Sequence, residues 1–202
     1  MKLAALVVMT TLNASGVQAR PKTGPDATIC LNNGLDLEDT SVLDRAEMTT
    51  TQMFALIRVQ LEWRGFGKPC PIDRDPILLV MMERTPAGAD PWAFGSAMPY
   101  EGIHIQIFFD RIKANRPELV APILAHVLAH EIAHVLEATD FHSATGVMKL
   151  RWGRGELESM RVRPMSFTPF DSILLHHGID SRHMYLEAVR RGLSSPNLMA
   201  AE

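Results

Sequence analysis

The feature that most constrains this chain is the apolar stretch from Leu119 to Ala138, which carries His130-Glu131-Ile132-Ala133-His134 in its second half. The neighbouring side chains are uncharged, so the stretch predicts a long and largely buried helix. Residues four apart share one face of a helix, which allows the imidazoles of His130 and His134 to approach a single ion. A buried glutamate between two histidines needs a chemical reason, because burying a charge is unfavourable.

Zinc chemistry supplies that reason. Neutral histidine is a preferred zinc ligand, with a nitrogen–metal distance of about 2.0–2.1 Å. Glu131 directly follows the first histidine and therefore leans to the side of the metal, where it can take a proton from a metal-activated water and pass it to a leaving group. We therefore predict a zinc-dependent metallohydrolase with Zn²⁺ bound by His130 and His134 and with Glu131 as the general base.

Catalytic zinc usually has three protein ligands, so a third ligand is expected downstream. His142 lies eight residues after His134, in a short connector where Gly146 allows a tight turn. The alternatives are Asp140, six residues after His134, and a more distant acid on a following helix, Glu156 or Glu158. We predict His142 as the third ligand and keep Asp140 as the alternative.

The N-terminus has the pattern of a signal peptide. Lys2 precedes the short apolar run Leu3–Met9, and Val17-Gln18-Ala19 offers small residues before a cleavage site. Residues 1–19 are therefore predicted to be removed, which places the mature chain in the periplasm or outside the cell. We expect no later segment to span a membrane, and the net charge of −3 gives no reason to expect nucleic acid as a partner.

Export favours a disulfide between Cys30 and Cys70, the two cysteines of the chain. This bridge would join the N-terminal arm, predicted to be irregular over residues 20–43, to the segment after the first helix. Closing the loop should contribute roughly 3–4 kcal/mol. The alternatives are two free buried thiols, or Cys30 as an inhibitory metal ligand.

The remaining pattern predicts an α+β fold in a single domain, residues 44–202. Apolar residues at helical spacing indicate a first helix from about Asp44 to Trp63. Short apolar runs indicate strands, and helical pieces are expected near the C-terminus. The expected strands are Ile77–Met82, Ala93–Met98 and Ile103–Phe109, and the helical pieces are Gly155–Met160, Pro169–Leu175 and Arg182–Arg191.

The segment from His130 to Met148 resembles the metzincin clan of zinc endopeptidases. His142-Ser143 followed by Gly146-Val147-Met148 is similar to the third ligand and methionine-containing turn of that clan. Phe94–Pro99 and Ile103–Ile105 resemble its edge strand and the strand before its active-site helix. The chain also resembles small exported bacterial proteins that combine HExxH, His-Ser, Gly-x-Met and Arg-Trp. This resemblance implies a zincin-like fold, with a small mixed sheet packed on a first helix and on the active-site helix, and Met148 beneath the metal.

Two positions depart from the metzincin pattern. The clan places a glycine three residues after the second ligand and the third ligand three residues further on, and these positions hold Glu137 and Asp140. If His142 is the ligand, the connection is two residues longer than in the clan. Some members use aspartate as the third ligand, so the resemblance leaves Asp140 open.

These observations together predict an endopeptidase that cleaves a peptide or protein substrate. A strand near Ala93–Met98 could hold an extended peptide by strand addition. The alternative function is a non-catalytic exported module that keeps a zinc site, on a degenerate zincin fold, for stability or binding.

Overall fold

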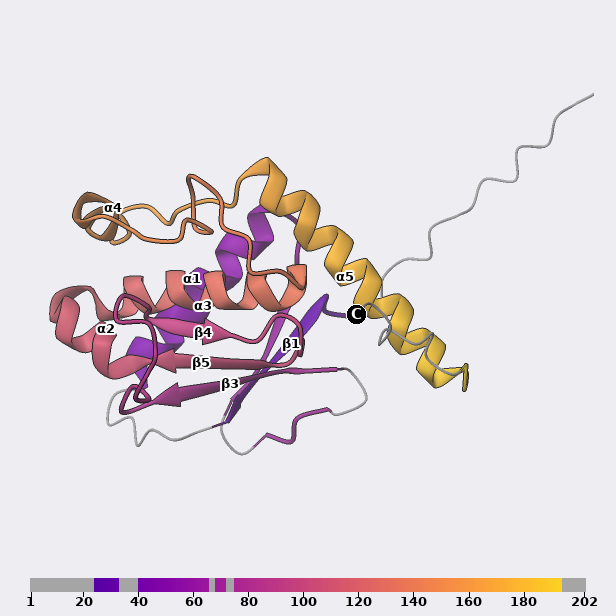
Figure 1. Ribbon diagram of the computed structural model, residues 1–202. Helices are drawn as coiled ribbons and strands as arrows, with labels where there is room; N and C mark the ends of the chain where they lie inside the picture. The colour runs from indigo at the N-terminus through magenta and orange to yellow at the C-terminus, as the bar shows by residue number, and fades with distance from the viewer. Residues whose placement is uncertain (1–23, 33–39, 66–67, 72–74, 194–202) are drawn as a thin grey trace, which may run out of the picture.

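Five strands form one mixed sheet in the computed structural model, which describes residues 24–32, 40–65, 68–71 and 75–193 (Figure 1). Neighbouring strands are parallel except at one edge, where β4 runs antiparallel to β5. This sheet and the helices that pack on it confirm the predicted fold class. In spatial order the strands are β2 (Leu61–Arg64), β1 (Ala27–Asn32), β3 (Ile77–Met82), β5 (His104–Phe108) and β4 (Gly95–Ala97).

Strand β1 lies within the N-terminal arm, where the prediction of irregular structure over 20–43 is wrong for residues 27–32. The strand is inserted between β2 and β3, and Ile29 pairs with Trp63 on one side and Ile77 on the other. Ile29 and Cys30 are buried. The turn-forming residues around this six-residue strand dominate the local composition, which is why the sequence pattern missed it.

Helix α1 (Ser41–Leu56) is shorter than the predicted helix Asp44–Trp63, because the chain leaves the helical conformation at Arg58. Arg58 has a φ of +62°, and its N–H donates to the carbonyl oxygen of Ala55. The end of the predicted helix is instead strand β2, beside β1. The apolar spacing of Ile57 and Leu61 fits a helix by coincidence, since these residues lie in a turn and a strand.

The other predicted elements are present with small shifts in their bounds. β3, β4 and β5 lie within the predicted strands, and α3 (Val120–Glu137) and α4 (Arg154–Ser159) match predicted helices. Before α3 come α2 (Phe109–Asn115) and the short 3₁₀ helix η2 (Pro117–Leu119). The two predicted C-terminal helical pieces are one continuous helix, α5 (Pro169–Arg190).

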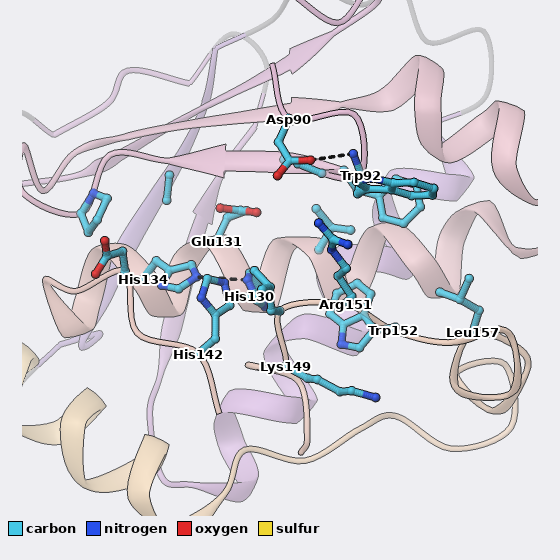
Figure 2. Close-up of a pocket in the computed structure, with 18 of the residues that line it drawn as sticks. Asp90, Trp92, His130, Glu131, His134, His142, Lys149, Arg151, Trp152 and Leu157 are labelled. Atoms are coloured by element: carbon cyan, nitrogen blue, oxygen red, sulfur yellow. Dashed lines mark hydrogen bonds between the residues drawn. The ribbon is translucent and has the colours of Figure 1, made fainter. Parts of the chain in front are cut away.

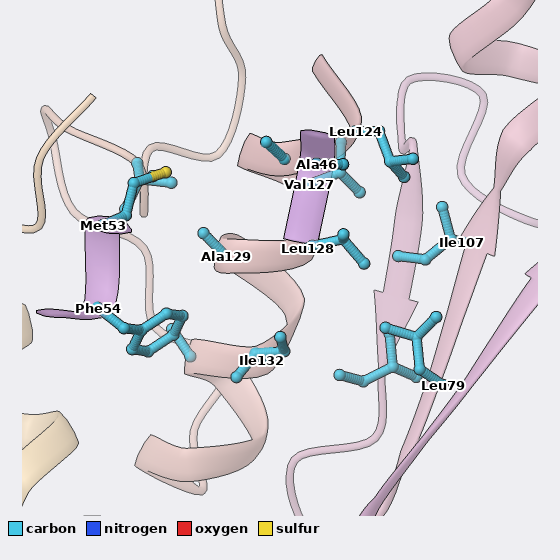
Figure 3. Close-up of a cluster of buried hydrophobic side chains, with 14 of the residues drawn as sticks. Ala46, Met53, Phe54, Leu79, Ile107, Leu124, Val127, Leu128, Ala129 and Ile132 are labelled. Carbon is cyan, nitrogen blue, oxygen red and sulfur yellow. The ribbon is translucent and has the colours of Figure 1, made fainter. Parts of the chain in front are cut away.

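Helix α3 is the centre of the fold because it packs against the sheet on one side and against α1 on the other (Figures 1 and 3). Figure 3 shows Phe54 and Met53 of α1 on one side of α3 and Leu79 and Ile107 of the strands on the other. A helix covered on two sides is apolar almost all round, as α3 is. The polar motif therefore lies in the middle of the hydrophobic core.

The span Pro117–Glu137 meets the length and hydropathy of a membrane helix, with a mean hydropathy of 1.6. The sequence analysis did not expect a segment of this length and hydropathy after residue 19. However, 83% of this window is buried inside the fold. The burial between α1 and the sheet is a sufficient reason for its apolar composition.

A disulfide joins Cys30 of β1 to Cys70, as predicted. It closes a loop across 40 positions of sequence, from the second strand of the sheet to the segment before β3. The bond is typical of chains that fold in an oxidising compartment.

Replacing both cysteines, Cys30→Ser with Cys70→Ser, should lower the free energy of unfolding by about 3–4 kcal/mol, since the denatured chain loses its cross-link. For a chain of this length the melting temperature should fall by about 8–15 °C, measured by circular dichroism. Reduction of the wild type should give a similar loss and should leave the double variant unchanged. An equal melting temperature for wild type and variant would contradict a stabilising bridge.

Candidate metal centre

Three imidazoles meet beside the C-terminal half of α3 (Figure 2). His130 and His134 come from successive turns of α3, and His142 comes from the connector that follows it. The Nε2 atom of His134 lies 3.0 Å from that of His130 and 3.3 Å from that of His142. One ring nitrogen from each histidine lies within 4.8 Å of the others. In a tetrahedral zinc site, ligand nitrogens are about 3.3 Å apart, so the spacing suits that ion.

Backbone carbonyls fix the protonation of two of these rings. The Nδ1 atom of His130 is 2.9 Å from the carbonyl oxygen of Val147, and that of His134 is 2.9 Å from the carbonyl oxygen of Thr139. A carbonyl oxygen can only accept, so each Nδ1 carries the proton and each Nε2 presents a lone pair. The two Nε2 atoms therefore face one another without a proton between them, an arrangement that a metal cation satisfies.

Burial keeps the histidines in the neutral form that binds metals. It lowers the pKa of His130 to about 3, with a further lowering by the His134 imidazole. Burial also lowers the pKa of His134 to about 4 and that of His142 below its ordinary value. The Nε2 lone pairs are thus available for metal binding even in mildly acidic solution.

Glu131 faces the edge strand β4 from α3. Its side chain is 7% exposed, and its carboxylate accepts a hydrogen bond from the backbone N–H of Ala97. Burial raises the pKa of Glu131 to about 8, against the opposing effect of that hydrogen bond. A nearby metal cation would act in the opposite direction and favour the carboxylate.

Gly95 of β4 leaves the space that Glu131 occupies. A Cβ atom at position 95 would lie 2.9 Å from both Cγ and Oε1 of Glu131. The edge strand and the glutamate therefore approach so closely that any other residue at position 95 would require the Glu131 side chain to shift. The sequence resemblance included this glycine but did not indicate its contact with Glu131.

The candidates for a third ligand lie in different surroundings. Asp140 is exposed, and its Oδ1 accepts a hydrogen bond from the hydroxyl of Tyr100 at 3.2 Å. Glu156 binds Lys149 through both carboxylate oxygens at 2.8 Å, and Glu158 pairs with Arg116. Among the described residues, the side chain that joins His130 and His134 is that of His142.

A tight turn after His142 brings this histidine back over α3. The N–H of Ser143 donates to the carbonyl oxygen of Met148 at 2.9 Å, and the N–H of Val147 donates to that of Ser166. Gly146 has a φ of +78°, and a Cβ there would lie 2.5 Å from the Ser166 oxygen. Met148 is fully buried beneath this turn.

Asp171, which the sequence analysis did not single out, anchors the same turn. It is fully buried and accepts hydrogen bonds from the Ser143 hydroxyl and from the N–H of Thr168 at 2.7 Å. Thr168 and Asp171 form the capping box at the start of α5. The spacing Thr-Pro-x-Asp is a recognisable helix start, and it was the available signal for this residue.

His126, one turn before His130 on α3, is a buried histidine whose two ring nitrogens both have hydrogen-bond partners. Its Nδ1 lies 2.7 Å from the carbonyl oxygen of Pro122, and its Nε2 accepts from the N–H of Met165 at 2.9 Å. The ring of Trp152 lies nearly perpendicular to the rings of both His126 and His130, in T-shaped contacts. These contacts hold the chain after the turn against the back of the histidine cluster.

A cavity of about 590 Å³ opens onto the three histidines and Glu131. One wall is the segment Asp90–Pro99, which includes β4, and the opposite wall is the segment Lys149–Trp152 together with Leu157. A substrate in this cavity would touch the metal ligands and the glutamate at the same time.

No family model matches this chain, and no curated protein matches its sequence. Among solved structures, the chain is similar to archaemetzincin from Methanopyrus kandleri, with a TM-score of 0.52 and 17% sequence identity. The match covers 76% of this chain and 96% of the archaemetzincin chain. The fold is zincin-like. At this identity the likeness establishes the fold and not the chemistry of the site.

Proposed function

We propose that this zincin-like protein is a zinc-dependent metallohydrolase that cleaves peptide bonds. The observation that carries the proposal is the meeting of three imidazole Nε2 atoms beside the buried carboxylate of Glu131, at the base of an open cavity. His130, His134 and His142 would hold the ion, which supplies Lewis-acid polarisation of a carbonyl and activation of water. Met148 would form the apolar floor of the site.

Glu131 would act as the general base. Its position against β4, outside the cluster of the three rings, leaves its carboxylate free to take a proton from the attacking water and deliver it to the leaving nitrogen. The hydrogen bond from Ala97 and the contact with Gly95 hold the carboxylate in one place. This preorganisation is what general-base catalysis requires.

The edge strand β4 supports a polypeptide as the substrate. β4 pairs with β5 on one side and is the last strand of the sheet, so its other edge can bind an extended peptide. Residues 95 and 97 of β4 also line the cavity. A peptide added to this edge would therefore lie directly over Glu131.

A non-catalytic zinc module is the less favoured function. A structural zinc site is closed by four protein ligands, whereas the cluster within the described residues has three and opens onto a cavity. We also propose that the protein is exported. The predicted signal peptide, residues 1–19, lies outside the residues that the structure describes. The disulfide Cys30–Cys70 supports export.

The test is the metal content of the purified mature chain, measured by elemental mass spectrometry for the wild type, His142→Ala and Asp140→Ala. We expect about one zinc per wild-type chain and per Asp140→Ala chain, and at least a ~10-fold weaker affinity in His142→Ala. A folded wild type that stays empty after addition of zinc would overturn the proposal. Zinc and peptide cleavage retained in His142→Ala would instead indicate another third ligand: Asp140 if Asp140→Ala loses them, and a distant glutamate if Asp140→Ala also retains them.

A further inference from the structure

The part of the cavity next to residues 90–94, which precede β4, has apolar walls and charged residues at its opening. Trp92 and Phe94 lie on one side, and Val127, Trp152 and Leu157 lie on the other. Apolar walls of this kind accept apolar side chains of several types, and specificity comes from the few polar groups in such a pocket. The charged residues at the opening are therefore the features that can discriminate between substrates.

Most of the charged groups that line the cavity already have partners. Lys149 binds both oxygens of Glu156, and the carboxylate of Asp140 accepts from Tyr100. The Oδ1 atom of Asp90 accepts from the backbone N–H of Trp92 at 2.8 Å. Each of these interactions reduces the ability of the group to bind a substrate.

Arg151 is the exception. Its guanidinium lies 5.6 Å from the centroid of the Trp92 ring, and no ion pair joins it to a carboxylate of the described residues. Figure 2 shows the side chain reaching from the segment after Met148 across the cavity to Trp92. Stacking on an aromatic ring orients the guanidinium but leaves its N–H donors free.

The direction of the bound peptide determines which residues reach Arg151. Antiparallel pairing is the more stable mode of adding a strand to β4. A peptide in that mode has its N-terminal part near Pro99 and its C-terminal part near Trp92, because β4 runs from Gly95 to Ala97. The part of the substrate on the C-terminal side of the cleaved bond then passes Arg151.

We infer that Arg151 selects substrates that carry a carboxylate on the C-terminal side of the cleaved bond. A guanidinium binds a carboxylate through two parallel hydrogen bonds, which neither an amide nor a hydroxyl can replace. The carboxylate can be the free C-terminus of a short peptide or the side chain of an aspartate or glutamate. This inference rests on the proposed peptidase function, since it names the substrate class of the same site.

Two matched pairs of fluorescence-quenched peptides test it on the zinc-loaded mature chain. The first pair differs only by Glu or Gln two positions after the cleaved bond, and the second only by a free or amidated C-terminus at that place. We expect wild type to cleave at least one acidic member with a kcat/KM about 10-fold higher than its neutral partner. In Arg151→Gln this ratio should fall to about 1. The pair that shows the effect identifies the source of the carboxylate.

Arg154→Gln is the matched control, because Arg154 is an exposed arginine three residues later, at the start of α4, that does not line the cavity. It should keep the wild-type ratio for both pairs. A wild type that cleaves peptides with a ratio near 1 in both pairs would overturn the inference and leave the peptidase proposal intact. An acidic preference that survives Arg151→Gln would also overturn it.

A binding measurement separates this inference from the peptidase proposal. Fluorescence anisotropy is measured for the same peptide sequences without the quencher, with Glu131→Gln alone and combined with Arg151→Gln. About 10-fold tighter binding of an acidic peptide, lost in the double variant, would support Arg151 as the selecting residue even if the wild type cleaves nothing. Equal binding of both members of each pair would contradict it.

Discussion

Glu131→Gln should lower kcat/KM for peptide cleavage by about 10²–10⁴-fold while the zinc content stays at one per chain. The glutamine keeps the shape of the side chain, so the backbone N–H of Ala97 still has an oxygen acceptor. What the variant loses is the ability to accept a proton. Activity is measured with peptides that the wild type cleaves, and zinc by elemental mass spectrometry of the same samples.

Loss of folding would be a trivial cause of inactivity, and the burial of Glu131 argues against it. Because the folded metal-free chain holds the pKa of Glu131 near 8, above the ordinary 4.5, this carboxyl lowers the stability of the fold as pH rises from about 4.5 to about 8. Glutamine has no charge to bury and removes that effect. We therefore expect the metal-free variant to melt at or above the wild-type temperature at pH 7.

Glu137→Gln provides the matched control. Glu137 lies near the end of the same helix, and burial likewise raises its pKa to about 8, with Asp171 adding to the shift. It does not line the cavity. This variant should retain full cleavage. Wild-type activity in Glu131→Gln, or equal losses in both variants, would contradict the assignment of Glu131 as the general base.

The sequence predicted the residues at the centre of the site better than it predicted the contacts that position them. The pair His130 and His134 follows from helical spacing alone, and Glu131 follows from its place between them. His142 could be proposed but not separated from Asp140, since both lie within reach of the pair along the chain. In the structure the Nε2 atom of His142 lies 3.3 Å from that of His134, whereas Asp140 is exposed and accepts a hydrogen bond from Tyr100, 40 residues earlier. Such long-range contacts leave no periodic pattern in a sequence.

The errors in the fold have the same origin. β1 and β2 were missed because short parallel strands are stabilised by their neighbours in the sheet rather than by local pattern. The break expected between the two C-terminal helical pieces includes Gly178, where the structure has an uninterrupted helix. A glycine within a helix lowers its intrinsic stability, so that break was the reasonable expectation. At Gly178 a contact with another helix provides the reason for the glycine.

Gly178→Ala should be among the most destabilising single substitutions in this chain. A Cβ atom at position 178 would lie 1.8 Å from the carbonyl oxygen of Leu136, at the C-terminal end of α3. Backbone atoms on both sides of the contact cannot give way as a side chain can, so α5 must move. We expect a loss of about 3 kcal/mol and a fall in melting temperature of about 6–12 °C.

Gly155→Ala is the control for the change of residue itself. Gly155 lies in helix α4, and nothing lies within 4 Å of the position that its Cβ would take. Alanine there should raise stability by about 0.5–1 kcal/mol, because it restricts the unfolded chain and favours the helix. A Gly178→Ala variant that melts within about 2 °C of the wild type would contradict the close helix crossing.

The same substitution should weaken the metal site, although Gly178 touches none of its residues. Helix α5 carries Asp171, which binds Ser143, the residue after His142. A shift of α5 away from α3 would loosen this contact and the turn that places His142 over His134. We expect about a 10-fold weaker affinity for zinc in the folded variant, measured by competition with a chelating dye at 10 °C, where the variant remains folded. Unchanged affinity in a destabilised Gly178→Ala would mean that His142 is held by the turn alone, through Gly146 and Ser166, and that Asp171 serves only to begin α5.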